Sequence, residues 1–131
     1  MEEELILFET AKLAKEKGFD IPVLYAFDDD NGQITSSYCK DVFDRKNYNT
    51  SGYKCSRPTQ SLLQKWLREI HNIDIEIFKA CNKDSSWYRV YIKQNDKVVW
   101  NPAQLQNESM QYKKYEQAIE VVLFESLKLI K

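Results

Sequence analysis

One histidine and three cysteines are the residues of this chain that could hold a transition metal. The four residues are Cys39, Cys55, His71 and Cys81. Structural zinc sites draw their ligands in close pairs a few residues apart, whereas these four stand ten or more positions apart. We therefore expect no metal and no cofactor, and we expect three reduced thiols.

Nucleophilic catalysis would need a base beside a serine or cysteine, and His71 is the one imidazole available. His71 falls at the end of a predicted helix, where the helix dipole favours a positive charge. The chain has no Gly-x-Ser-x-Gly turn and no clustered glycines for a phosphate-binding loop. We predict no catalytic residue and no cofactor-binding residue.

A run of acids, Asp28-Asp29-Asp30, precedes Asn31-Gly32. With Gly32 as the sixth position of an EF-hand loop, the twelfth position is Tyr38, so the acid that ligates calcium is missing. An EF-hand is excluded. Weak attraction of a divalent ion to residues 28–30 stays open.

Residues 40–57 form the most basic stretch and show neither helical nor strand periodicity. The stretch holds five Lys and Arg against two Asp, a local excess of three positive charges, with aromatic residues between them. Cations with aromatic rings suit contact with single-stranded nucleic acid. The alternative is a solvated loop whose rings pack onto the domain, and we expect the loop to be flexible. The candidate binding residues are Arg45, Lys46, Tyr48, Tyr53, Lys54 and Arg57.

The first half of the chain predicts a helix and a hairpin. A helix over residues 3–17 has its apolar stripe on Leu7, Ala11 and Ala14, and Gly18 followed by Phe19 is typical of a Schellman ending. Strands over 23–27 and 33–39 would be joined by a turn at Asn31-Gly32.

The second half predicts a helix capped by Thr59 and ended by Asn72, then strands, then a long helix. Isoleucines alternate over residues 73–77, and the strands over 87–93 and 97–100 follow. A 3–4 spacing of apolar residues runs through the last helix, which we expect to place Glu120 on its polar face. The predicted core comprises Leu63, Trp66, Leu67, Ile75, Ile77, Ile119, Val122 and Leu123.

These elements predict one α+β domain over residues 1–131. Short connections favour an antiparallel sheet of four or five strands with three helices, in the order α-β-β-α-β-β-(β)-α. The chain has 131 residues, the size of one domain, and 43% of them are hydrophobic.

Charge and cysteine content limit the partners and the compartment. The net charge of -1 excludes a general polycation. An odd number of cysteines favours a reducing compartment, and the acidic start Met-Glu-Glu-Glu-Leu differs from the basic start of a signal peptide. We expect a cytoplasmic protein with no membrane contact.

Part of the chain resembles a known family of proteins. The resemblance lies in residues 58–69, with the sequence Pro-Thr-Gln-Ser-Leu-Leu-Gln-Lys-Trp-Leu-Arg-Glu, and in His71-Asn72, which follow them. They are similar to a motif of small uncharacterised proteins encoded by phages and integrated mobile elements of Bacteroidetes. The opening helix ending at 17–20 and the closing helix from Tyr115 to Ile130 fit the same family. The resemblance implies a source and no particular activity.

The functional expectation is a small non-enzymatic accessory protein that contacts another protein. A nucleic-acid-binding protein that uses residues 40–57 is the alternative, and an enzyme of unrecognised type is the further alternative. No small-molecule substrate can be identified from these residues.

Overall fold

This computed structural model describes residues 4–28, 45–50, 52, 54–100 and 114–131. In that part of the chain the elements follow the predicted order, so the α+β class is confirmed. The helices and strands are α1 (Phe8–Glu16), β1 (Tyr25–Asp28), a 3-10 helix (Tyr48–Thr50), β2 (Lys54–Arg57), α2 (Gln60–His71), β3 (Ile73–Cys81), β4 (Ser86–Gln94), β5 (Lys97–Trp100) and α3 (Tyr115–Leu127).

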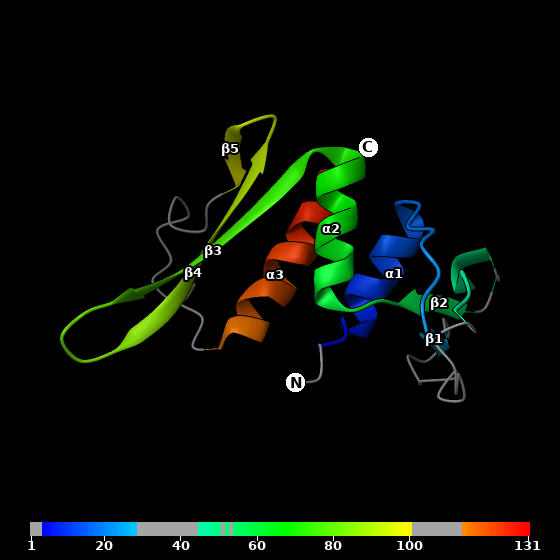
Figure 1. The fold of residues 1–131 in the computed structure, drawn as a ribbon, viewed down its shortest axis with the longest axis horizontal. Coiled ribbons are helices and arrows are strands. Elements are labelled where there is room, and N and C mark those ends of the chain that lie inside the picture. The colour runs from blue at the N-terminus through cyan, green and yellow to red at the C-terminus, as the bar shows by residue number, and fades with distance from the viewer. Residues whose placement is uncertain (1–3, 29–44, 51, 53, 101–113) are drawn as a thin grey trace.

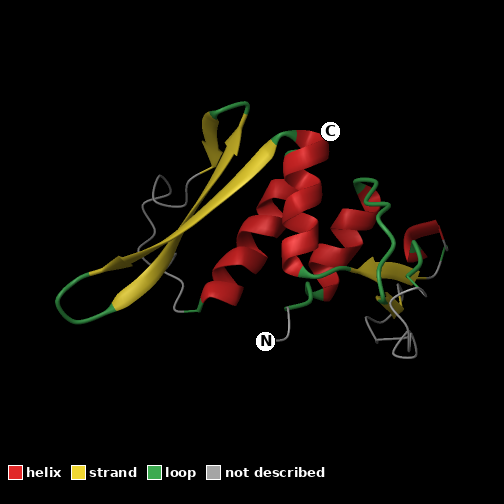
Figure 2. Ribbon diagram, viewed as in Figure 1, coloured by secondary structure: helices red, strands yellow, loops and turns green. Residues whose placement is uncertain are grey.

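The five strands form two antiparallel sheets rather than one. β1 pairs with β2, and β3, β4 and β5 form a separate sheet in that order. The chain separates the two sheets because α2 follows β2 directly and carries the backbone past the other helices before β3 begins. Figures 1 and 2 show the helices between the two sheets, with β1 and β2 beside α1 and the longer sheet beside α2 and α3.

The described partner of β1 is β2, in a register that places Phe27 opposite Cys55. The sequence predicted a loop through residue 57, and this was wrong for residues 54–57, where Cys55 and Ser56 are buried. Four residues are too few to show a strand period. The predicted strand over 33–39 and residues 40–44 lie outside the described part of the chain.

α1 begins at Phe8, later than predicted, because the residues before it are extended against the start of α2. Leu5 forms a bridge with Thr59, and the Ile6 amide donates to the Pro58 carbonyl oxygen over 3.1 Å. As a result Leu7, expected on the apolar stripe, is 59% exposed.

The predicted C-terminus of α1 and both predicted termini of α2 are confirmed. Gly18 has a positive φ of 90°, and the Phe19 amide donates to the Ala14 carbonyl oxygen, as in a Schellman motif. The Thr59 side chain accepts a hydrogen bond from the Leu62 amide over 3.1 Å, and Asn72 ends α2 in the left-handed conformation.

One apolar cluster joins all three helices to both sheets. Six of the eight predicted core residues are buried in it, from Leu63 in α2 to Leu123 in α3. Ile75 and Ile77 face this cluster but are only half-buried. The reason is that the turn end of the β3–β4 hairpin extends past the helices, as Figure 1 shows.

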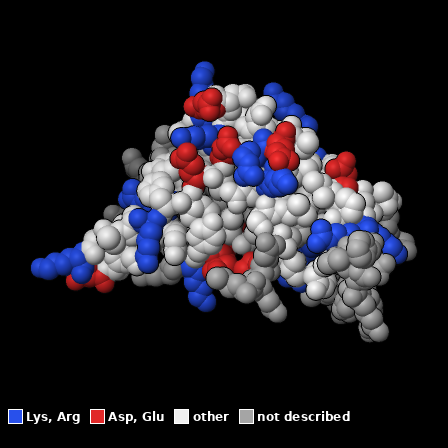
Figure 3. All heavy atoms as spheres, in the orientation of Figure 1, with Lys and Arg blue, Asp and Glu red and all other residues white. Residues whose placement is uncertain are grey.

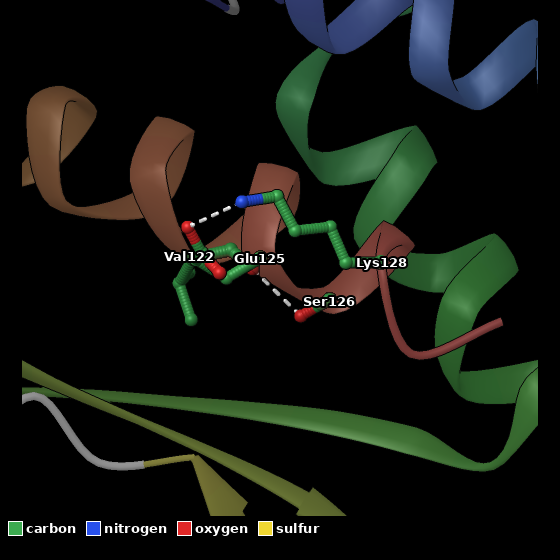
Figure 4. A network of polar contacts seen from close by, with 4 residues as sticks. All are labelled: Val122, Glu125, Ser126 and Lys128. Atoms are coloured by element: carbon green, nitrogen blue, oxygen red, sulfur yellow. Dashed lines mark hydrogen bonds and ion pairs between the residues drawn. The ribbon is translucent and has the colours of Figure 1, made fainter.

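α3 places a serine inside the core without an unsatisfied hydroxyl. Ser126 is fully buried and donates to the Val122 carbonyl oxygen over 2.7 Å, while Lys128 pairs with Glu125 on the other side of the helix (Figure 4). None of the helices in the described part of the chain has the length and hydrophobicity needed to cross a membrane.

Candidate functional site

A pocket of about 390 Å³ lies where the start of α2, the end of β2 and residues 22–25 meet. Its lining contains four cations, and none of the described residues that line it is acidic. We call it the basic pocket. It is lined by Leu5, Pro22, Val23, Leu24, Tyr25, Arg45, Arg57, Pro58, Thr59, Ser61, Leu62, Lys65 and Arg68.

Arg57 is the most firmly positioned of the four cations. It is the last residue of β2, its Nε donates to the Ile6 carbonyl oxygen over 2.9 Å, and its Cζ lies 4.6 Å from the centroid of the Phe27 ring. No described residue accepts a hydrogen bond from its two terminal nitrogens. These donors therefore remain available to an anionic ligand, in the planar geometry that suits phosphate or carboxylate.

Burial lowers the pKa of Arg57 from its ordinary value, and the nearby charges of Glu120 and Glu4 act in the opposite direction. An arginine keeps its proton in proteins even when half-buried. The site consequently holds a permanent, partly desolvated positive charge. Such a charge interacts more strongly with an anion than a fully hydrated one does.

Arg45 enters the pocket from a different part of the chain. The next residue, Lys46, forms a bridge with Val23 through two backbone hydrogen bonds of 2.9 Å. This pairing fixes the backbone beside Arg45, although the Arg45 side chain is exposed.

Lys65 and Arg68 line the pocket from α2. Together with Ser61 they recur at intervals of four and three residues, which places all three on one side of the helix. Both cations are exposed, and neither forms an ion pair with a described residue. On the face seen in Figure 3, Lys and Arg side chains gather over α2 and toward β2, with some acids among those over α2.

A buried carboxylate ties together the elements behind the pocket. Glu120 was predicted on the polar face of the last helix, and this was wrong, because it is only 9% exposed. Its carboxylate accepts hydrogen bonds from the Leu7 amide, the Thr10 hydroxyl and the Gln60 side-chain amide. Gln60 is the first residue of α2, so this network joins α1, α2 and α3 beside the pocket-lining Thr59.

The structure places only some of the residues nominated from the sequence at the basic pocket. Arg45 and Arg57 line the basic pocket, whereas Lys46, Tyr48 and Lys54 do not. Tyr48 is half-buried against the core, and the Lys54 Nζ lies 5.8 Å from its ring centroid. The remaining candidate, Tyr53, lies outside the described residues.

Tyr25, Lys65 and Arg68 are among the lining residues that sequence reasoning missed. The signal for the two cations was the spacing of residues 61, 65 and 68 on the polar side of α2. Tyr25 gave no separate signal, because it alternates with its neighbours as any strand residue does.

The two described cysteines and the histidine do not come together, and Cys39 lies outside the described residues. Cys55 is buried in β2, Cys81 is exposed at the end of β3, and His71 packs against Trp66 with ring centroids 4.6 Å apart. The described residues contain no group of three His, Cys, Asp or Glu side chains that could hold a metal. Asp28 is half-buried in β1, while Asp29 and Asp30 lie outside the described residues.

No protein family, no curated protein and no solved structure matches this chain. The class of protein is therefore described from its fold and its pocket alone. It is a small α+β protein with a concave site that is lined by four cations. Such a site can bind an anionic group, and its apolar lining can hold a flat hydrophobic group next to that anion.

Proposed function

We propose that this chain is a non-enzymatic binding protein that holds single-stranded nucleic acid in the basic pocket. The observation that carries the proposal is the position of Arg57, whose terminal nitrogens have no described partner in a pocket shared with Arg45, Lys65 and Arg68. Phosphate contacts by Lys and Arg supply most of the affinity of proteins for nucleic acids.

A single strand fits the site better than a duplex. Recognition of a duplex places a helix or a strand ribbon into a groove, whereas a single strand offers unstacked bases to concave sites with aromatic side chains. Tyr25 supplies such a side chain and is 37% exposed at the pocket.

The proposal of a binding role without catalysis is supported by the position of the one imidazole. His71 lies at the far end of α2 from Thr59 and does not line the pocket. The described residues that line the pocket include four cations, which can hold a phosphate, and no histidine, aspartate or glutamate that could act there as a general base.

The test measures fluorescence anisotropy of a labelled 12-nucleotide oligonucleotide at low salt. Charge reversal of both exposed helix cations, K65E/R68E, should weaken binding roughly tenfold or more, because two phosphate contacts become repulsive. The matched control is R89E/K97E, which makes the same charge change on β4 and β5, away from the pocket. Equal affinity in the two double variants would contradict the proposal.

A second candidate function is contact with another protein, and the outer side of the three-stranded sheet favours it. Phe78 is 43% exposed and stacks on Tyr91 at 5.2 Å, and Val98 on β5 is 51% exposed. Exposed apolar side chains that lie together on a sheet are typical of protein interfaces. The variant F78S/V98T should lose a partner captured by the wild-type protein from a bacterial lysate, while K65E/R68E should keep it.

The compartment and the source are part of the same proposal. The odd number of cysteines supports a role in the cytoplasm, where thiols stay reduced. The similarity of residues 58–72 to small proteins of phages and mobile elements supports an accessory role in such an element.

A further inference from the structure

The lining of the basic pocket combines two kinds of side chain. Cations come from three separate segments, and apolar groups come from residues 22–25 and from Leu62 on α2. A site for a simple inorganic anion would need only the cations. The mixed lining instead fits a ligand that carries negative charge next to a flat apolar group.

Tyr25 and Arg57 are placed so that both parts of one ligand can be held at once. The two residues are directly opposite each other in the β1–β2 register. Opposite residues of an antiparallel pair lie on the same face of the sheet, with Cβ atoms roughly 5 Å apart. Both side chains line the basic pocket, and the guanidinium of Arg57 lies over the ring of Phe27.

The size of the pocket limits how much of a strand it can take. A volume of about 390 Å³ is near the lower end of the range of roughly 300–1,000 Å³ for small-molecule sites. This space suits one nucleotide and is too small for several stacked ones. Neighbouring nucleotides would have to lie outside the pocket.

The number of cations and their origin on three segments of the chain favour a ligand with more than one phosphate. Arg45, Arg57, Lys65 and Arg68 supply four positive charges, and no described acid lines the pocket. Each phosphodiester of a strand carries one negative charge, so a single phosphate would leave three of the four positive charges unmatched. A nucleotide within a strand has a phosphate on each side, which accounts for cations from several segments.

We infer that the basic pocket binds one nucleotide of a strand together with both of its flanking phosphates, with the base against Tyr25 and one phosphate on Arg57. This inference rests on the proposed nucleic-acid binding and names the unit that the pocket recognises. Lys65 and Arg68, one helical turn apart, hold the second phosphate. A tyrosine-phosphorylated peptide shares the ring and one phosphate but lacks the second phosphate.

Calorimetric titration of the full chain at low salt tests the inference with defined probes. Adenosine 3′,5′-bisphosphate should bind at least about tenfold tighter than adenosine 5′-monophosphate, since the second phosphate adds contacts with Lys and Arg. Adenosine and inorganic phosphate should each bind more weakly than the monophosphate. The bisphosphate should also displace the 12-nucleotide oligonucleotide.

Two variants of Tyr25 distinguish the contribution of base stacking to binding from the contribution of the phosphate contacts. Y25A should weaken bisphosphate binding roughly fivefold or more, because the base loses its stacking surface, whereas Y25F should bind like the wild type. Pyrophosphate binding should be unchanged in Y25A. Circular dichroism melting of Y25A and Y25F shows whether both variants remain folded.

The outcomes distinguish this inference from the proposed function. Oligonucleotide binding that the bisphosphate does not displace would overturn the inference and leave the proposed function standing. If neither the bisphosphate nor the oligonucleotide binds, both the inference and the proposed function are overturned. Pyrophosphate binding as tight as the bisphosphate, or tighter binding of a phosphotyrosine peptide, would show an anion site or a peptide site in place of a nucleotide site.

Discussion

The guanidinium of Arg57 lies over the ring of Phe27, with Cζ 4.6 Å from the ring centroid. Together with the hydrogen bond from Nε to the Ile6 carbonyl oxygen, this contact fixes the plane of the guanidinium at the basic pocket. The side chain thus contributes to the fold through its Nε and its face, and its terminal nitrogens are left for the proposed ligand.

The variant R57K keeps the charge and removes the planar group. We expect unfolding free energy to fall by about 1 kcal/mol, because the Nε hydrogen bond and the stacking on Phe27 are lost. Oligonucleotide affinity should fall as well, since lysine cannot bind a phosphate through two parallel hydrogen bonds. The matched control R45K, at an exposed position in the same pocket, should leave stability unchanged in urea unfolding. A fully stable R57K protein would contradict the positioning role.

The buried carboxylate of Glu120 gives a second prediction. The variant E120L should lose about 3 kcal/mol of unfolding free energy, because the buried Thr10 hydroxyl, the buried Gln60 side-chain amide and the part-buried Leu7 amide all lose this acceptor. E120Q retains one acceptor and should lose less. Urea unfolding of both variants measures this, with E116Q, an exposed position on the same helix, as the control. Equal stability of E120L and E116Q would contradict the network.

The packing of the core predicts that two apolar positions differ in how much unfolding free energy is lost when they are changed to alanine. Leu67 is fully buried, so L67A should cost about 2–5 kcal/mol of unfolding free energy. Ile77 is half-buried on β3, and I77A should cost roughly half of that or less. Thermal and urea unfolding of the two variants provide the comparison, and a larger loss in I77A would show that the sheet, not α2, dominates the core.

The two described cysteines should differ in reactivity. Cys81 is exposed and Cys55 is fully buried, so in a C39S background a thiol reagent should modify Cys81 in the native protein and Cys55 only after unfolding. Unfolded wild-type protein should titrate with three thiols. Rapid modification of Cys55 in the native state would show that β2 opens readily.

Local signals in the sequence were sufficient to predict where α1 and α2 end. Asn72 was expected to end α2 in the left-handed conformation, and it does so with a φ of 53°. Gly18 and Phe19 likewise formed the expected Schellman ending. Such endings depend on the few residues around them, which is why they can be read without knowledge of the fold.

The site could not be predicted in the same way, because it depends on contacts between residues far apart in the sequence, which local patterns do not contain. Glu120 follows the period of a polar position, and its burial becomes apparent only when donors from Thr10 and Gln60, 110 and 60 residues away in sequence, are placed around it. In the same way, counting charge along the chain found Arg45 and Arg57, whereas Lys65 and Arg68 join them only in the folded structure.

The salt dependence of oligonucleotide binding tests the central claim most directly. If the cations of the basic pocket contact the two phosphates that flank one nucleotide, a plot of log K against log salt concentration should have a slope of about −1.4, at roughly −0.7 for each phosphate of a single strand that is contacted. Neutralising Lys65 and Arg68 in K65A/R68A removes the contacts with one of these phosphates and should reduce the magnitude of the slope by about 0.7. An unchanged slope in K65A/R68A, or a wild-type affinity that does not depend on salt, would contradict the assignment of this pocket as the nucleic-acid site.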